Sequence, residues 1–381
     1  MWYIQIDTLF IILIFSVFYT VLGITLRKNQ WKFNLVPFLL IFDLFILAYV
    51  SKSLALFYII YTLITYIMVF ALEKCNVLRK YIFFLFCILC ILPLIYMRMT
   101  KFTDVLPHFI VLIGFAFNML KAIDALYYVY YTKRHIKLIP YANYLLFFPV
   151  LTAGPIFRYR DFIVYYENPV FPDGEKTLWC AKRFISGLFK KLVIVPWLLW
   201  YLHFLMQHTG SFWISFIIVF VCYALLHTDF SGYSDMAIAT GTFVGIPVPE
   251  NFDKPIKSAS FTQFWHRWHI TLSDWLREHV FIVLSGKKLN KYQAALVAFT
   301  ILFLMGAWRG FTILDISRGI YLGLLIGLEN LISQTTFNKE KQGTLVYVLR
   351  CFIVAFLFSI GATTFFLNET QIAGVLKGFL P

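Results

Sequence analysis

Residues 55–72 of the chain read ALFYIIYTLITYIMVFAL, a run of apolar and uncharged side chains. A helix needs roughly 20 such residues to cross the hydrocarbon core of a bilayer, so this run is close to the required length. Similar runs recur at Leu9–Gly23, Leu35–Val50, Tyr81–Tyr96, Leu106–Leu120, Phe212–Leu226, Ala294–Gly306, Gly319–Leu331 and Val346–Phe366. Together they predict an all-α polytopic membrane protein with about nine to eleven transmembrane helices.

The overall composition agrees with a membrane environment. Of the 381 residues, 61% are hydrophobic and 14% are charged, which is far from the balance of soluble globular domains. No polar segment of domain size stands apart, so we expect a single membrane domain over 1–381. It would have N-terminal spans at 1–140, a motif-bearing core at 141–310 and C-terminal spans at 311–381. The core mixes short apolar stretches with Pro-containing ones, which predicts short re-entrant and interfacial helices.

The basic residues indicate orientation and surroundings. Met1–Asp7 contains no Lys or Arg, whereas the next connection contains Arg27, Lys28 and Lys32, so we expect the N-terminus outside a plasma membrane. A charged n-region and a small-residue cleavage site are missing, which predicts a retained first anchor. The net charge of +14 is spread over many connections, and this favours membrane lipid with an anionic surface over nucleic acid as the partner.

Cysteine and metal chemistry receive little support. The six cysteines lie mostly inside apolar runs, and the Cys87/Cys90 pair has no neighbouring charge that would stabilise a thiolate. His266 and His269 are three residues apart, but no Asp, Glu or Cys follows at a recognisable ligand spacing. We therefore expect no metal site.

Charged residues follow an irregular segment near the middle of the chain. Gly154-Pro155 interrupts a helix, and Arg158 comes three residues later. Irregular backbone at membrane depth requires surrounding protein or a watery cavity, so Arg158 is a candidate for a substrate path. An interfacial loop whose Arg reaches lipid headgroups is the alternative.

Two carboxylates, Asp229 and Asp235, lie near the end of a strongly apolar helix. Ionisable groups in such a place are costly, which favours a functional role on a substrate path. Structural pairing with a neighbouring Arg is the alternative.

An amphipathic helix is predicted after the Pro-rich linker Gly245–Phe252. Ser260 and Gln263 have the spacing of a capping box at its start. Seven apolar side chains then form one stripe, namely Phe261, Phe264, Trp265, Trp268, Leu272, Trp275 and Leu276. His269 would lie on the edge of this stripe, where a histidine is either a structural donor or a catalytic group.

The sequence FWHRWHITLSDWLRE at 264–278 closely resembles the signature helix of bacterial membrane-bound O-acyltransferases, whose members include alginate O-acetylases and D-alanyl–teichoic acid transferases. Four other segments agree in order: 147–159 with GPIFRY, Gly187–Lys191, 229–238, and 245–255 with PENF. The matches cover roughly Leu145 to Gly310. The resemblance implies a ring of helices around a thin centre, where two funnels meet.

The resemblance also implies a reaction and its participants. An acyl group, acetyl or D-alanyl, would pass from a cytoplasmic thioester to a hydroxyl of an exported cell-envelope polymer or polysaccharide. The thioester, on carrier-protein phosphopantetheine or on coenzyme A, would be a substrate, and no bound cofactor is expected. An acyl carrier protein on the cytoplasmic side and an extracellular acyl-transfer partner are the candidate partners.

Two histidine positions carry the family's chemistry, and only one of them is histidine here. The first matches His269, and Trp268 beside it is a candidate for the substrate path. The second lies in LMGAWRG at 304–310, where Arg309 replaces the family His and the preceding Trp308 is also a candidate for the substrate path. A general base needs an acceptor lone pair and a pKa near the working pH, and a guanidinium has neither.

Three interpretations of Arg309 remain open. His269 is the remaining base of a modified enzyme, the protein is a non-catalytic relative that binds the same ligands, or Arg309 is an introduced inactivating change. In each, Arg309 could still hold a phosphate or carboxylate or stabilise an oxyanion. A transporter unrelated to acyl transfer is disfavoured, because no two corresponding halves with broken helices are evident.

Overall fold

The computed structural model describes residues 6–29, 35–99, 114–282, 290–310, 312–332 and 343–379. Within these ranges the regular structure is helical, and the β-type contact is an isolated antiparallel bridge between Phe252 and Trp268. The chain divides into two compact units, Met1–Ile185 with Asp235–Pro249 and Ser186–Ser234 with Glu250–Pro381. The single membrane domain expected from the sequence stays a prediction.

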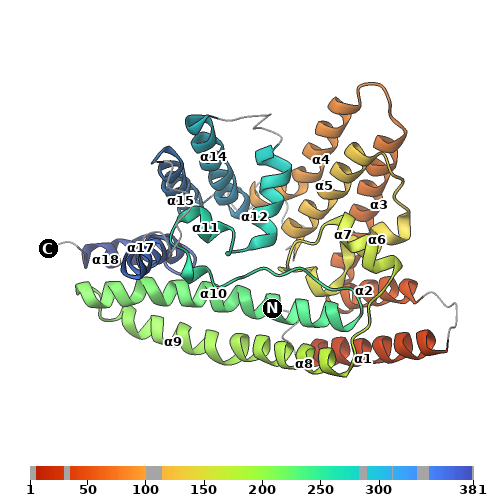
Figure 1. Cartoon of the computed structure of the whole chain (residues 1–381), viewed down its shortest axis with the longest axis horizontal. Helices are drawn as coiled ribbons and strands as arrows, with labels where there is room; N and C mark the ends of the chain where they lie inside the picture. Colours follow the sequence, from red (N-terminus) through yellow and green to blue (C-terminus); the bar gives the residue numbers. More distant parts are fainter. Residues whose placement is uncertain are drawn as a thin grey trace. The chain divides into compact units, whose positions relative to one another are not determined.

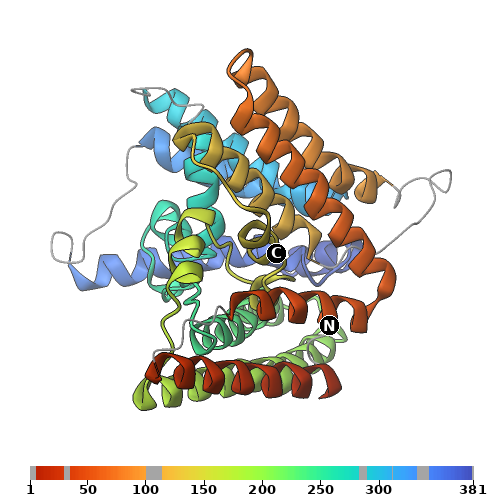
Figure 2. The same cartoon turned by 90° about the vertical axis from the view of Figure 1, so that its right-hand side faces the viewer.

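The first unit contains the N-terminal helices and the shorter helices that follow them (Figure 1). They are α1 (Ile6–Lys28), α2 (Val36–Val50), α3 (Lys52–Lys74), α4 (Arg79–Met99), α5 (Phe115–Thr132), α6 (Leu138–Leu146), the 3-10 turn η2 (Phe148–Val150), α7 (Tyr159–Glu167) and most of α8 (Gly174–Phe189). Helices α3, α4 and α5 pack against one another, as the orange helices of Figure 2 illustrate. The expected run Leu106–Leu120 falls partly outside the described residues.

Six of the described helices are long and apolar enough to cross a membrane. These segments are Asp7–Lys28, Lys52–Lys74, Arg79–Met99, Gly174–Met206, Phe212–Phe243 and Thr344–Thr363. Two shorter apolar helices, Pro37–Val50 and Lys291–Gly306, accompany them. The all-α polytopic fold is therefore confirmed, and the chain is a multi-pass membrane protein. The count of nine to eleven spans stays a prediction.

The second unit contains the C-terminal helices and most of the candidate site. Its elements are the π-helical turn η3 (Lys190–Ile194), α9 (Val195–Met206), α10 (Phe212–Phe243, as far as Ser234), η4 (Pro255–Lys257), α11 (Phe261–Trp265), α12 (Ile270–Leu276), the π-helical turn η5 (Arg277–Phe281), α14 (Lys291–Arg309), α15 (Ile313–Ile332), α17 (Thr344–Thr363) and α18 (Glu369–Lys377). Two apolar clusters organise these helices, one around α9 and one around α11.

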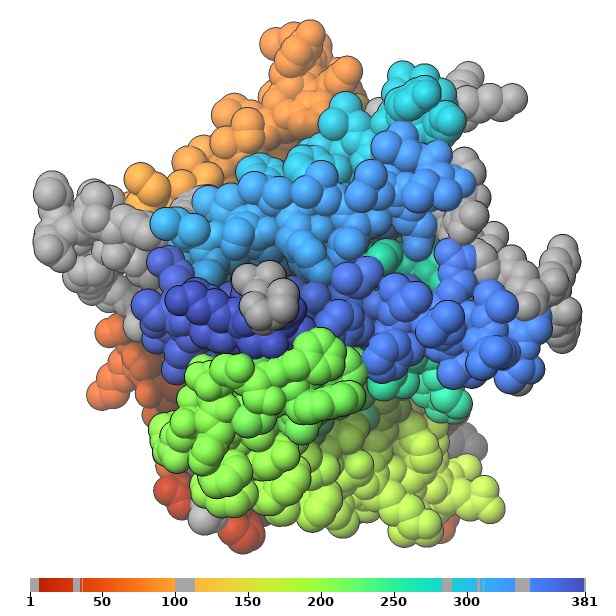
Figure 3. Space-filling model, turned by 90° about the vertical axis from the view of Figure 1, so that its left-hand side faces the viewer, coloured from red at the N-terminus to blue at the C-terminus, as the bar shows by residue number. Residues whose placement is uncertain are grey.

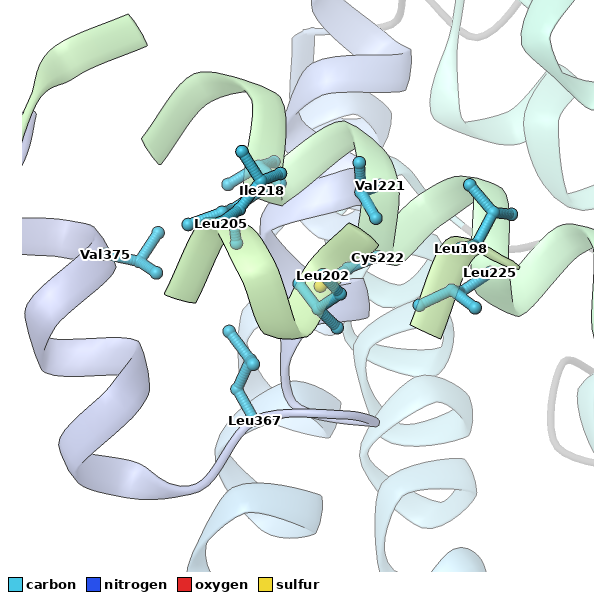
Figure 4. Packing of buried hydrophobic residues seen from close by; sticks show 10 residues of the cluster. Leu198, Leu202, Leu205, Ile218, Val221, Cys222, Leu225, Leu367 and Val375 are labelled. Atoms are coloured by element: carbon cyan, nitrogen blue, oxygen red, sulfur yellow. The ribbon is translucent and has the colours of Figure 1, made fainter. Parts of the chain in front are cut away.

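The first cluster joins α9, α10 and the C-terminal segment. Figure 4 shows Leu205 of α9 beside Ile218 of α10 and Leu202 beside Cys222, with Val375 of α18 and Leu367 at the edge of the cluster. Side chains that face away from the cluster stay exposed: on α9, Trp200 is 62% exposed. Figure 3 shows the green α9 segment beside the blue C-terminal helices. An apolar surface of this kind is unfavourable in water and suits contact with lipid.

Helices α14 and α15 approach closely because glycines face each other. A Cβ added at Gly306 would lie 2.5 Å from the Asp315 carbonyl oxygen and 2.8 Å from the Gly319 Cα. Only a residue without a side chain fits between these two backbones. The close approach brings the end of α14, which carries Arg309, next to the start of α15.

Candidate active site

The predicted signature helix is not continuous. Helix α11 ends at Trp265, and α12 begins at Ile270. His269 lies between them with φ 47° and ψ 52°, the left-handed conformation that few residues other than glycine adopt. The expectation of one helix with His269 on the edge of its stripe was therefore wrong.

The helix breaks because its backbone hydrogen bonds go to the Pro-rich linker instead. The Ile270 N–H donates to the Asn251 carbonyl (2.9 Å), and the Asp253 N–H donates to the Arg267 carbonyl (3.0 Å). Residues 251–253 thus pair with residues 267–270 and take the donors and acceptors that an α-helix would use. A strained residue held in place by such pairing is a reason to look for function there.

The start of α11 is fixed by two sets of contacts. As predicted, Ser260 caps the helix, because its Oγ accepts from the Gln263 N–H (3.1 Å). Glu329 of α15 adds a second cap that the sequence did not reveal. Its Oε1 accepts from the Phe261 N–H (2.7 Å), and its Oε2 accepts from the N–H and the hydroxyl of Thr262 (both 2.7 Å). A partly buried carboxylate therefore anchors the segment that leads to His269.

His269 is bound to a buried amide. Its Nδ1 is 3.1 Å from Asn251 Oδ1, which also lies 3.3 Å from the Thr271 N–H nitrogen and 2.9 Å from the Thr271 hydroxyl. Asn251 Nδ2 donates to Ser234 Oγ (3.2 Å). Asn251 is 1% exposed and His269 is 8% exposed. Burial lowers the pKa of His269 to about 4, so the ring is neutral at physiological pH.

Aromatic side chains surround this position. The His269 ring lies 6.1 Å from the Phe230 ring and 6.5 Å from the Phe252 ring, measured between centroids. Trp268 points into the second apolar cluster, where it stacks on Phe264 (5.5 Å) and contacts Phe358 (5.0 Å). Trp268 thus contributes to the core beside His269, and its place on a substrate path stays a prediction.

Arg309 takes part in an ionic network at the junction of α14 and α15. Its Nε is 3.4 Å from Asp315 Oδ1, and the same oxygen accepts from Arg318 Nη2 at 2.6 Å. Both guanidinium groups lie over the Phe365 ring, 3.7 Å and 4.2 Å from its centroid. Thr312 Oγ1 donates to Asp315 Oδ2 (2.6 Å). The side chain of the neighbouring Trp308 lies outside the described residues.

The negative charge of Asp315 balances part of the positive charge in this network. Burial alone would raise the pKa of Asp315, but hydrogen bonds from Thr312 and Arg318, together with both positive charges, bring it below its usual value. Asp315 is therefore ionised at neutral pH and balances one of the two arginines. Arg309 cannot act as a base, because a guanidinium has no acceptor lone pair. Its charge is partly neutralised by Asp315.

Asp229 and Asp235 each pair with a cation, in different units. In the second unit Asp229 Oδ1 forms an ion pair with Lys191, which lies in the π-helical turn η3. In the first unit Asp235 Oδ1 accepts from Arg183 Nε at 2.9 Å. Asp235 thus shows the pairing with an Arg that was the alternative interpretation, whereas Asp229 pairs with a Lys. A place on a substrate path stays a prediction for both carboxylates.

Arg158 lies in the first unit at the start of α7. Its Nη1 is 3.5 Å from Asp124 Oδ1, and both side chains are more than nine-tenths buried, which does not fit an Arg that reaches lipid headgroups. Asp124 Oδ2 also accepts from the Tyr159 N–H (2.7 Å). The role of Arg158 on a substrate path stays a prediction.

Two further buried ionisable residues hold the irregular segment before Arg158. Lys121 Nζ donates to the carbonyl oxygens of Tyr144 (3.0 Å) and Leu145 (2.6 Å). Asp43 Oδ1 accepts from the Phe148 N–H (2.9 Å). The sequence signal for these contacts was an ionisable residue within an otherwise apolar helix segment, Asp43 in α2 and Lys121 in α5.

Comparison with known proteins gives consistent results. The chain matches the sequence model of MBOAT, the membrane-bound O-acyltransferase family, over residues 71–360. It is 32% identical over 285 residues to a probable alginate O-acetylase AlgI of Pseudomonas syringae pv. tomato, covering 72% of this chain and 52% of that protein. It is 29% identical over 322 residues to a teichoic acid D-alanyltransferase of Streptococcus thermophilus, covering 77% and 75%.

A third relative is named for a different polymer, peptidoglycan. The chain is 33% identical over 251 residues to a peptidoglycan O-acetyltransferase of Helicobacter pylori, covering 63% of this chain and 46% of that protein. The chain spans about half the length of its alginate and peptidoglycan relatives.

Proposed function

Because the chain belongs to the membrane-bound O-acyltransferase family, we propose that it transfers an acyl group to a hydroxyl of a cell-envelope polymer, with His269 as the base. Relatives named for alginate, teichoic acid and peptidoglycan support this class of acceptor and an acetyl or D-alanyl group. The single observation that carries the proposal is a buried, neutral His269 in a strained conformation within the signature segment.

The proposed step is a direct transfer. His269 takes the proton of the acceptor hydroxyl as its oxygen attacks the thioester carbonyl. The new C–O bond forms, the C–S bond breaks, and the proton passes from His269 to the departing thiolate. Burial lowers the pKa of the ring to about 4, so the ring is neutral before and after the step and the imidazolium exists only during it. Arg309 takes no proton in this scheme.

The proposal also includes the location of the reactants. The donor thioester would lie on the cytoplasmic side of the plasma membrane, on a carrier protein or on coenzyme A, and the acceptor would lie outside together with the N-terminus. Lys or Arg in the connections after the first spans supports this orientation. Extracellular acyl-transfer partners remain part of the proposal.

Labelled acyl transfer by the purified full chain tests this function. Acetyl-coenzyme A and a D-alanyl carrier protein would each be offered with alginate oligomers, lipoteichoic acid and peptidoglycan fragments. We expect turnover with one pair, and a fall of about 10²–10⁴-fold in His269→Ala. His266→Ala is the matched control, because His266 is exposed in the same segment and should leave turnover unchanged. Equal turnover in His269→Ala would contradict the assignment.

A second function is favoured by the network around Arg309. A protein that has replaced one catalytic histidine by an ion-paired Arg could bind the same donor and acceptor without reaction. In that case the labelled donor would bind to the wild-type protein while turnover stayed absent. Arg309→His would then be the variant in which weak transfer emerges.

A further inference from the structure

The orientation of the Asn251 side-chain amide is fixed by its neighbours. The Thr271 backbone N–H can only donate a hydrogen bond, so the atom of Asn251 that faces it, 3.3 Å away, must be the carbonyl oxygen Oδ1. The amide nitrogen Nδ2 then faces Ser234 Oγ, which accepts at 3.2 Å. A flipped amide would place a donor against the Thr271 donor, and this excludes it.

This orientation determines the tautomer of His269. Asn251 Oδ1 is an acceptor and lies 3.1 Å from His269 Nδ1. The ring nitrogen must therefore donate, and the proton of the neutral ring is on Nδ1. In a neutral imidazole the other nitrogen, Nε2, then keeps its lone pair.

The amide is placed to act on His269 and not merely to fill space. Asn251 is 1% exposed, and its own carbonyl accepts from the Ile270 N–H (2.9 Å), the first residue after His269. One residue thus fixes the backbone beside His269 through its main chain and the ring through its side chain. The left-handed backbone of His269 is sustained by the same contacts.

We infer that Asn251 is a positioning residue that holds His269 as the Nδ1–H tautomer, so that Nε2 is the atom that takes the proton of the acceptor hydroxyl. The inference rests on the proposed acyl transfer for its consequence, but the tautomer itself does not. Asn is suited to the task because it orients the ring without adding a charge. A carboxylate at the same place would favour the imidazolium and raise the pKa of the ring.

Other charged groups near His269 also influence the pH at which its ring titrates. The rings in contact with it, Phe230 and Phe252, carry no charge. The ionisable side chains on the neighbouring segments include His227 and Asp229 on α10, Glu250, Asp253 and Lys254 beside Asn251, His266 and Arg267 before His269, and Asp274 on α12. Asp229 is paired with Lys191, and Asp274 with Arg277.

Nitrogen NMR of histidine-labelled full-length protein in detergent tests the tautomer without any substrate. The His269 signals are assigned by their loss in His269→Gln. At neutral pH we expect a protonated Nδ1 and an unprotonated Nε2 in the wild type. A proton on Nε2 would overturn the inference, and this measurement needs no variant of Asn251.

The variant Asn251→Asp tests the positioning role. Aspartate has the same shape, and the Ser234 hydroxyl can turn to donate to it. The midpoint of the His269 titration should rise by about one to three pH units. Asn368→Asp is the matched control, because it adds the same charge at the N-cap of α18, where Asp is equally suitable, and should leave the midpoint unchanged.

Activity gives an independent readout that separates the two proposals. In Asn251→Asp the acid limb of the kcat profile should move to higher pH by the same amount, with KM unchanged. An active wild type whose profile does not move in Asn251→Asp would overturn the role of Asn251. A wild type without turnover on any donor, but with the expected tautomer and titration, would overturn the proposed function alone.

Discussion

The resemblance to the family predicts that His269 and Arg309 lie at its two histidine positions, and their surroundings within the second unit differ in kind. His269 is nearly fully buried and is held by an uncharged amide and aromatic rings. Arg309 has 39% of its side chain exposed and is held by a carboxylate, a second arginine and the Phe365 ring. One environment favours a neutral group with a lone pair, whereas the other favours a permanent charge.

The surroundings of Arg309 provide specific partners for its positive charge, namely Asp315 and the Phe365 ring. Asp315 is placed to balance a cation, and Thr312 orients its second oxygen. A neutral histidine at 309 would leave Asp315 with Arg318 alone as its charged partner, a pair that is complete in itself. The position therefore tolerates either residue electrostatically, but only His269 has an environment that suits proton transfer.

Asp315→Ala removes the carboxylate that pairs with Arg309 and Arg318, and it should have the largest effect on the free energy of unfolding. Arg318 is 5% exposed, and without Asp315 its charge would be buried beside Arg309, with like charges over one ring. Removing one partner of a buried pair typically costs about 3–5 kcal/mol. The free energy of unfolding in detergent micelles should fall by that amount.

The control for this variant is Asp274→Ala. Asp274 and Arg277 form a pair of the same type that is 38% and 50% exposed, and such pairs contribute about 1 kcal/mol or less. Equal losses in the two variants would show that the Asp315 network is no more than a surface ion pair.

Much of the fold follows from the sequence because the bilayer imposes simple requirements. Runs such as Leu9–Gly23 and Ala55–Leu72 became α1 and α3, with ends a few residues beyond the apolar stretch. The break at His269 could not be foreseen in the same way. Helical spacing of apolar side chains continues through 261–276, and only pairing with residues 251–253, which are distant in sequence, interrupts it.

The candidate site was predictable where it rests on local pattern. His269, Trp268 and Arg309 were found from motifs, and the Ser260 cap from its spacing. Glu329 was missed, because its partners lie 67 and 68 residues away and the only signal was a carboxylate in an apolar run. Asn251 was part of the quoted PENF segment, but its contact with His269 depends on the turn that the sequence did not predict.

The second prediction concerns His269 and the loss of stability at acid pH, and its expected effect is smaller than that of Asp315→Ala. The pKa of His269 is about 4 in the folded protein and near its ordinary value of 6.5 when unfolded. Above pH 6.5 the ring is neutral in both states, so no stability is lost. As the pH falls from 6.5 to 4, the unfolded chain binds a proton that the folded chain does not, which costs on the order of 3 kcal/mol.

The measurement compares the wild type with His269→Gln, which cannot titrate at this position. The difference between their free energies of unfolding should be constant above pH 6.5 and should change progressively below it, with the wild type losing more. Parallel curves down to pH 4 would show that His269 is protonated in the folded protein.

The smallest effect is expected for Arg309→Ala. Its side chain is 39% exposed, the ion pair with Asp315 is 3.4 Å long, and Asp315 keeps Arg318 as its partner. The loss should be about 1 kcal/mol, from a partly screened pair and a cation–π contact. Transfer activity should also change little, because in the proposed step Arg309 takes no proton. A fall in activity comparable with that of His269→Ala, at unchanged unfolding free energy, would instead mean that Arg309 binds a reactant or stabilises the developing oxyanion. The two positions would then form one active site despite their different environments.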